Sequence, residues 1–549
     1  MRAAGLLLLI AAPLLALAAE PTLQLARRDG QEDVLLTLNR QQVLSRQALP
    51  ASLSAPLGSL WKLFVYAYQT DLARTEAPYH CSGRDREEVY CCEPGQSVDR
   101  GQALVKSCGL YFAPQRLEIT PAAWRQYWQT QQAPDWLTEL SRLTPETRVP
   151  VHELLRVLAT LPGRDQAQNL LLDVTLNAGG DPAGALGSVL RVKTWSWHEN
   201  GDAQTRVGGF AGWLSDGSPV WAQGAGTSKT VLNQYADALA AALPPPALSR
   251  TADDGCVVVK LFSRYPLTSV MRQEDGQTAA QGMLRGRYDV LFANGNRLAL
   301  ESRGELFLTR EGDAPRLTAR LTREEYVARV IEREAKTEPE EAAKAMAVAI
   351  RSYLQQNARR EGECLLIDDS SASQRVAPSP AGTAARAIAA RTASLVLAGT
   401  TVNYHYDNAG EARMSWLQAV EQAKSGMRYN AILAQAFPRG NLSRWDNPQA
   451  SCQPLPDAEA WLRGRQRDWR ITLNREPGYV ATEVFAVCRL ASGRPYTDRA
   501  QRRIYVRNFY SLQDRLDLTH EYLHLAFDGY PSSQDEHYIE SLTRQLLLE

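Results

Sequence analysis

The sequence predicts an α+β protein of several domains. At 549 residues the chain is longer than one hydrophobic core supports, because cores stop growing at about 300 residues. A strand-like run, VVVKLF from Val257, alternates with helical patterns. Turn-forming residues at 244–246 and 444–457 interrupt these patterns and mark boundaries. Three domains are therefore predicted, over residues 20–245, 253–447 and 448–549.

Residues 1–19 are predicted to be a signal peptide. One basic residue, Arg2, precedes an apolar run from Leu6 to Leu17, and small residues suit cleavage after Ala18 or Ala19. No later apolar run is long enough to span a bilayer. We therefore expect an exported, periplasmic protein without a transmembrane anchor.

Cysteine usage agrees with export. Eight cysteines in an exported chain predict disulfides rather than metal ligands. Each third of the chain holds an even number, so we expect the bridges to stay within domains. The pairing within the first group remains open. The groups are Cys81, Cys91, Cys92 and Cys108; Cys256 and Cys364; Cys452 and Cys488.

The charge composition does not favour a charged polymer as partner. Lysine plus arginine and aspartate plus glutamate both total 61, which gives a formal net charge of +0. Overall charge therefore does not attract nucleic acid, and none is expected as a partner.

The first domain carries a candidate serine nucleophile. Ser59 and Lys62 lie three residues apart at the start of a helical pattern, so a desolvated Lys62 could take the proton of Ser59. The stretch PLGSLWKLFVYAY resembles the active-site helix of penicillin-binding proteins and related serine transferases. That resemblance implies an α/β domain with Ser59 as nucleophile and Lys62 as base.

Two further segments of this domain resemble the same family. Ser107 opens SCGLYF, where the family has S-x-N, and Gly109 replaces the Asn. Lys193-Thr194-Trp195 is similar to K-[ST]-G, with Trp195 replacing the Gly, and an indole there should block or reshape the pocket. The resemblance implies that Ser107 relays protons and that Lys193 and Thr194 bind a carboxylate. The alternative is a degenerate domain that binds peptidoglycan peptide or only folds.

The second domain contains a predicted helical hairpin from Leu321, punctuated by Pro339. Taken alone, its Glu334 and Arg351 are ordinary surface charges. The pattern resembles the stage II sporulation protein D and amidase-enhancer family of lytic transglycosylases over about residues 255–445. This resemblance implies an α+β domain in which Glu334 is general acid and then base for glycan cleavage, with Arg351 nearby.

The third domain is predicted to be small, mainly helical and zinc-binding. The sequence LTHEYLHLAF contains H-E-x-x-H, and residues four apart share a helix face. His520 and His524 can therefore bind one Zn²⁺, with Glu521 beside it as a base. The alternative is a helix with two solvated histidines and one glutamate.

The third zinc ligand is expected on the next helical pattern, QDEHYIESLTRQLL. The motif resembles zinc peptidases of the gluzincin type, whose third ligand is a Glu on the following helix, and this resemblance implies Glu536. Spacing alone leaves Asp535, His537 and Glu540 open.

The order of domains is similar to the YfaQ-like family of predicted secreted bacterial proteins. That resemblance implies peptidoglycan as a partner, and bacterial alpha-2-macroglobulins or penicillin-binding proteins as neighbours. The leading hypothesis is a wall-associated zinc-dependent peptidase or amidase. The runner-up is a lytic transglycosylase acting through Glu334, and the third hypothesis is a non-catalytic wall-binding scaffold.

Overall fold

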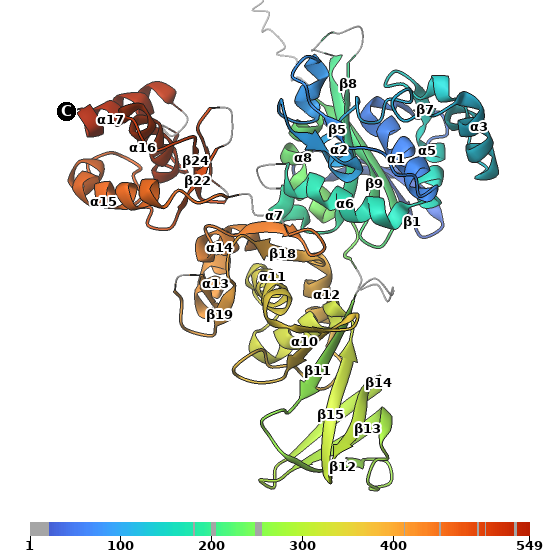
Figure 1. Cartoon of the computed structure of the whole chain (residues 1–549), viewed down its shortest axis with the longest axis vertical. Coiled ribbons are helices and arrows are strands. Elements are labelled where there is room, and N and C mark those ends of the chain that lie inside the picture. The colour runs from blue at the N-terminus through green and yellow to red at the C-terminus, as the bar shows by residue number, and fades with distance from the viewer. Residues whose placement is uncertain are drawn as a thin grey trace, which may run out of the picture.

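The protein is described by a computed structural model, in which each predicted domain contains a β-sheet of its own (Figure 1). The predicted signal peptide and its cleavage site lie outside the described residues. No helix in the described part of the chain is long and apolar enough to cross a membrane. The described residues are 21–178, 182–198, 202, 205–246, 255–410, 412–448, 452–490, 494–499, 501–531 and 535–548.

The first unit is an antiparallel sheet covered by helices on both faces. Its six strands have the order β3-β2-β1-β10-β9-β8 among the described residues. Side chains alternate along each strand, so Trp195 of β8 enters one core while Val192 enters the core on the other face. The strands of this sheet are β1 (Leu23–Asp29), β2 (Glu32–Leu38), β3 (Val43–Ala48), β8 (Leu190–Trp197), β9 (Val207–Leu214) and β10 (Pro219–Ala225).

Helices and short strand pairs complete this unit. The helices are α1 (Trp61–Asp71), α2 (Arg100–Lys106), α3 (Pro121–Thr130), α4 (Asp135–Thr138), α5 (Val151–Ala159), α6 (Arg164–Leu176), α7 (Pro182–Leu186), α8 (Ser228–Gln234) and α9 (Ala236–Ala242). The short strands are β4 (Ser54–Pro56), β5 (Tyr79–His80), β6 (Ser97–Val98) and β7 (Arg148–Pro150).

The second unit joins a long sheet, drawn in green to yellow-green in Figure 1, to a helical layer, drawn in yellow to orange. Its seven strands have the order β12-β13-β14-β15-β11-β17-β16 in the part of the chain that is described, and only β11 and β17 pair in parallel. The strands are β11 (Cys256–Leu261), β12 (Leu267–Arg272), β13 (Gly282–Phe292), β14 (Arg297–Glu311), β15 (Ala314–Leu321), β16 (Arg359–Glu361) and β17 (Cys364–Asp368).

The alanine-rich helix α11 (Glu340–Asn357) lies at the centre of this second core. Most of its side chains from Ala342 to Leu354 are buried, because small residues let neighbouring elements approach closely. The other helices are α10 (Arg323–Glu334), α12 (Thr383–Arg391), α13 (Trp416–Lys424) and α14 (Tyr429–Ala436). The short strands are β18 (Leu395–Ala398), β19 (Asn403–His405), β20 (Arg413–Ser415) and β21 (Asn441–Arg444).

The third unit is mainly helical, as predicted, and is drawn in red and orange in Figure 1. A three-stranded sheet, β22-β24-β23, packs beside the helices and leaves β23 at one edge. The assignment to a zincin-like fold remains a prediction. The elements are α15 (Pro456–Leu473), β22 (Ala486–Arg489), β23 (Tyr496–Asp498), β24 (Arg503–Val506), α16 (Leu512–Ala526) and α17 (Glu536–Leu548).

Four disulfides use all eight cysteines, and each bridge stays within one third of the chain. This confirms the expectation from the sequence and resolves the pairing in the first group. The bridges are Cys81–Cys92, Cys91–Cys108, Cys256–Cys364 and Cys452–Cys488.

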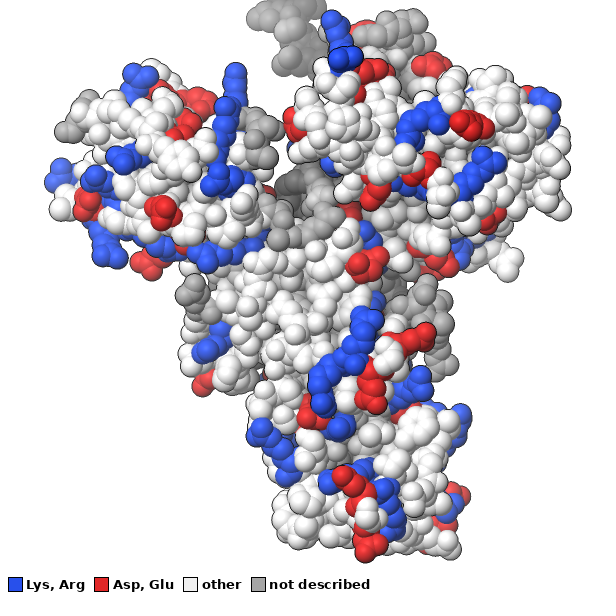
Figure 2. All heavy atoms as spheres, viewed as in Figure 1, with Lys and Arg blue, Asp and Glu red and all other residues white. Residues whose placement is uncertain are grey.

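Polar side chains join the three units. Arg444 of the second unit binds Asp173 of the first with Nε 2.8 Å from Oδ1. Arg503 of the third unit is fully buried and donates to the carbonyl oxygens of Pro438 and Gly440 of the second. Elsewhere, basic and acidic side chains are interspersed over the face drawn in Figure 2, in keeping with the balanced composition.

Candidate functional site

Three candidate ligand atoms converge at the start of α17. Ser511 caps α16 by accepting a hydrogen bond from the backbone of Asp514, which fixes where the helix begins. One turn apart on that helix, His520 Nε2 and His524 Nε2 lie 3.1 Å from each other. Glu536 Oε2 lies 3.1 Å from His520 Nε2, and Glu536 Oε1 lies 3.5 Å from His524 Nε2. All three ligand atoms lie within 4.8 Å of one another.

The other candidate ligands on α17 do not join this cluster. Asp535 Oδ1 accepts from the backbone nitrogens of His537 and Tyr538, which occupies it at the N-terminus of the helix. Glu540 Oε2 lies 3.8 Å from His520 Nδ1, the ring nitrogen that faces away from the cluster. Arg544 holds Glu540 there at 2.8 Å. Of the predicted alternatives, the structure brings Glu536 to the two histidines.

Glu521 lies beside the histidines in a cleft of about 970 Å³. It is only 8% exposed, and the Thr497 hydroxyl of β23 donates to its Oε2 at 2.9 Å. Burial raises the pKa of Glu521, while the hydrogen bond from Thr497 and the nearby His524 oppose that rise.

The donor set fits a zinc ion. Zinc takes imidazole nitrogen and carboxylate oxygen, and hydrolytic zinc sites have three protein ligands with an open position. His520, His524 and Glu536 supply two such nitrogens and one carboxylate facing an open cleft.

A second cluster forms around Lys62 in the first unit. Lys62 Nζ lies 3.2 Å from Ser59 Oγ and 3.1 Å from Ser107 Oγ, and it donates to the Ser107 carbonyl at 2.7 Å. Ser59 lies in the single 3₁₀ turn before α1, whereas Ser107 ends α2 with φ of 70°. The disulfide Cys91–Cys108 tethers the residue next to Ser107. The three residues predicted from the sequence are therefore in contact.

Burial changes the acidity of both lysines near this cluster. It lowers the pKa of Lys62 to about 8, although the carboxylate of Glu87 acts in the opposite direction. Burial also holds the pKa of Lys193 well below its usual range, with Lys62 adding repulsion. Lys193 Nζ donates to the carbonyl of Thr194 at 3.0 Å. Thr194 lines the same cleft of about 900 Å³ as Ser59 and Lys62.

Gly109 and Trp195, the two positions that depart from the motifs of the penicillin-binding proteins, differ in their surroundings. A Cβ at Gly109 would lie 3.5 Å from Glu87 Oε2 and 3.6 Å from Lys62 Cε, which are ordinary van der Waals contacts. The indole of Trp195 is 1% exposed, and a Cβ at Gly209 would lie 2.9 Å from its ring. Trp195 thus packs against the neighbouring strand and forms part of the floor of the cleft.

Glu334 is the last residue of α10, and the protein contacts both of its carboxylate oxygens. The Tyr404 hydroxyl donates to Oε2 at 2.6 Å, and the backbone nitrogen of Arg375 donates to Oε1 at 2.8 Å. Burial is the largest influence and raises the pKa of Glu334, while these two hydrogen bonds oppose the rise. Gln374 Nε2 in turn donates to the Tyr404 oxygen at 2.9 Å.

Tyr404 is a residue that the sequence did not single out. It lies about 70 positions after Glu334, so neither helical spacing nor a local motif links the two. It lies within residues 255–445, the range of the family resemblance, but no residue type or spacing there marks it as part of the site.

Arg351 does not lie beside Glu334, which corrects the expectation from the family resemblance. Arg351 is fully buried and forms a two-pronged ion pair with Glu324, with Nε 3.0 Å from Oε1 and Nη2 2.5 Å from Oε2. Glu324 and Glu334 lie ten residues apart on α10, or about 15 Å along the helix. Arg351 therefore joins α11 to the N-terminal end of α10, whereas Glu334 lies at the C-terminal end of that helix.

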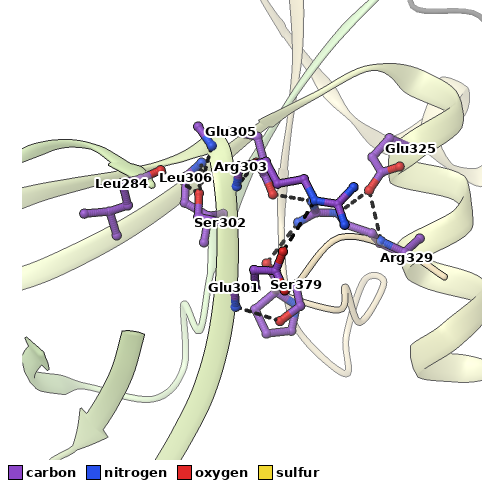
Figure 3. A network of polar contacts seen from close by, with 12 residues as sticks. Leu284, Glu301, Ser302, Arg303, Glu305, Leu306, Glu325, Arg329 and Ser379 are labelled. Carbon is purple, nitrogen blue, oxygen red and sulfur yellow. Dashed lines mark hydrogen bonds and ion pairs between the residues drawn. The ribbon is translucent and has the colours of Figure 1, made fainter. Parts of the chain in front are cut away.

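A polar network fixes α10 against the sheet (Figure 3). Arg329 of α10 is 1% exposed and binds Glu305 of β14 at 2.6 Å and Glu325 at 2.9 Å. It also donates to the Pro378 carbonyl at 2.9 Å, while Ser379 accepts from the backbone of Glu301. These contacts hold the helix that ends in Glu334.

The fold and these clusters define a multidomain protein of mixed α/β structure with a candidate site in each domain. A sequence model described as "Predicted secreted protein (DUF2300)" matches residues 83–204 and 412–532, and a model described as "Stage II sporulation protein" matches 312–378. The chain is 54% identical over 549 residues to the "Uncharacterized protein YfaQ" of Escherichia coli (strain K12), covering 100% of this chain and 99% of that one. The chain belongs to the family of YfaQ-like predicted secreted proteins, in agreement with the predicted export.

Solved structures resemble parts of the chain. A class D beta-lactamase from Bacillus subtilis matches with 16% identity and a TM-score of 0.28, covering 40% of this chain and 90% of that one. The transpeptidase domain of a D,D-transpeptidase from Legionella pneumophila matches with 14% identity and a TM-score of 0.24, covering 40% and 87%. The cluster of Ser59, Lys62 and Ser107 is therefore described by its own contacts alone.

Proposed function

We propose that the protein is a peptidoglycan-associated hydrolase whose C-terminal domain uses zinc to cleave a peptide or amide bond. One observation carries the proposal, namely the convergence of His520 Nε2, His524 Nε2 and a Glu536 carboxylate oxygen within 4.8 Å. Two of these atoms come from one helix and the third from the next, so chance alignment of surface groups is a poor explanation.

The surrounding residues support a division of roles. A zinc ion at this site would supply a Lewis acid that polarises a carbonyl and activates water. Glu521, within the same cleft, would accept the proton of the attacking water and then pass it to the leaving nitrogen. Thr497 would orient Glu521 by the hydrogen bond to Oε2. Glu540 and Arg544 would restrain the His520 ring from its Nδ1 side.

The experiment is a peptide hydrolysis assay on the mature chain, with and without a chelator. Glu521→Gln keeps the shape of the side chain but removes the base, so we expect activity to fall about 10²- to 10⁴-fold while the zinc content stays unchanged. Glu483→Gln, an exposed glutamate of the same domain, is the matched control. Full activity in Glu521→Gln, or in the chelated wild type, would contradict the proposal.

Glycan cleavage through Glu334 is the second candidate. Its support is a carboxyl group whose pKa is raised by burial and which Tyr404 and the Arg375 backbone contact. Glu334 and Arg375 lie within residues 312–378, which match the sporulation-protein model, whereas Tyr404 lies after that segment. A raised pKa keeps a fraction of Glu334 protonated nearer neutral pH, as a general acid requires.

Release of anhydro-muropeptides from purified sacculi tests this second candidate. Glu334→Gln should abolish release, whereas Glu361→Gln, an exposed control in the same unit, should not. Absence of anhydro products from the wild type would rule out this activity. Inertness in both assays, with binding to sacculi retained, would favour the third hypothesis of a wall-binding scaffold for envelope partners such as alpha-2-macroglobulins or penicillin-binding proteins.

A further inference from the structure

We propose that the cleft of the C-terminal domain takes peptides that carry a free carboxylate, and that Arg494 binds this carboxylate. The inference names the substrate class of the site described above and therefore rests on the proposed hydrolase function. Arg494 lines the same cleft as His520, Glu521 and Glu536.

The acidic groups of the cleft are already engaged by the protein. Each has a hydrogen-bonding or ion-pairing neighbour within the described part of the chain. The pairs are Asp517 with Gln513 at 2.7 Å, Glu521 with Thr497 at 2.9 Å, Glu536 with His520 at 3.1 Å, and Glu540 with Arg544 at 2.8 Å.

The basic groups of the cleft differ in this respect. Arg544 is neutralised by Glu540, and Arg499 lies 4.0 Å from Asp528. Arg494 is exposed, lines the cleft, and has no hydrogen bond or ion pair with any residue that the structure describes. Its guanidinium offers a planar fork of donors, which matches a carboxylate better than a neutral amide.

The position of Arg494 limits where the carboxylate sits in the substrate. Arg494 comes two residues before β23, and Thr497 of that strand contacts Glu521. Three residues of extended chain span about 10 Å. An extended substrate covers the same distance with about two or three residues, at about 3.4 Å per residue. If the peptide bond is cleaved beside Glu521, the carboxylate bound by Arg494 therefore lies within about two or three residues of that bond. Short peptides with a terminal or side-chain carboxylate fit this distance.

The test is a binding measurement that does not need metal. The full mature chain and its His520→Ala variant are titrated against a dye-labelled tripeptide with a free C-terminal carboxylate and against the same tripeptide as its amide. We expect both proteins to bind the carboxylate form about tenfold more tightly at low salt, since a charge-assisted hydrogen bond is worth that much. The preference should shrink as salt screens the charge.

Variants assign the preference to one residue. Arg494→Gln should remove the difference between the two peptides, and Arg494→Lys should keep part of it. Arg467→Gln, an exposed arginine on α15 outside the cleft, should leave the preference intact. Equal affinities in the wild type, a preference that survives Arg494→Gln, or no binding of either peptide would overturn the inference.

The outcome also separates this inference from the proposed function. A chain that prefers the carboxylate but holds no zinc would refute the hydrolase and retain the carboxylate site. A chain that holds zinc and cleaves peptides without regard to the carboxylate would retain the hydrolase and refute the role of Arg494.

Discussion

The serine cluster (Ser59, Lys62 and Ser107) and the histidine cluster (His520, His524 and Glu536) differ in the contacts that hold them together. Around Lys62, donors and acceptors satisfy one another, because an ammonium group lies between two hydroxyls and a carbonyl. Around His520, by contrast, ring nitrogens and a carboxylate face one another across about 3 Å. The first cluster is complete within the protein, whereas the second has a set of nitrogen and oxygen ligands that could hold a cation.

The two clusters also differ in burial. The Lys62 side chain is 8% exposed and sits in a core reinforced by two disulfides. The Glu536 side chain is 74% exposed and comes from a separate helix. We infer that packing positions the serine cluster, while a bound ion would position the histidine cluster.

The largest expected effect concerns the base of the serine cluster. If Lys62 activates Ser59, acylation by a fluorescent penicillin should rise with pH through about 8, because burial lowers the pKa of Lys62 to about 8 and only the deprotonated amine accepts a proton. Lys62→Met should lower the acylation rate by about 10²-fold or more. Labelling followed over pH 6 to 10 measures both. An absence of any adduct on Ser59 would show that the assembled cluster only folds.

Loss of one disulfide should affect the serine cluster and leave the histidine cluster unchanged. Cys91→Ser with Cys108→Ser removes the tether next to Ser107, and a loop of this length contributes about 3 kcal/mol to stability. We expect a lower unfolding temperature and loss of penicillin labelling, with zinc binding unchanged. The matched control is Cys452→Ser with Cys488→Ser, which removes the disulfide of the third domain instead. Retained labelling in the first variant would contradict the assigned role of the tether.

A smaller effect is expected when the missing motif residue is restored. Gly109→Asn should be accommodated within about 0.5 kcal/mol, since the nearest atoms lie 3.5 Å or more from the new Cβ. The added amide would face Lys62 and a bound acyl group, so we expect penicillin labelling to become about tenfold faster through one further hydrogen bond. Gly464→Asn, at a position of α15 with open space around it and no positive φ, serves as the control for stability.

Local patterns predicted more than long-range ones. His520 and His524 could be placed on one helix face because a fixed spacing determines it. The mixed α/β organisation and disulfides within domains also followed from the sequence. Tyr404 could not be identified, and Arg351 was assigned to the wrong neighbour, because both depend on how α10 packs in three dimensions. The choice of Glu536 over Glu540 likewise depends on the rotation of α17, which spacing does not fix.

The zinc content of the purified mature chain, beside that of His520→Ala, tests the central claim most directly. Elemental mass spectrometry after reconstitution and dialysis should find about one zinc per chain in the wild type and none in the variant. A wild-type chain that holds no zinc after reconstitution, or a variant that keeps it, would contradict the account of the histidine cluster.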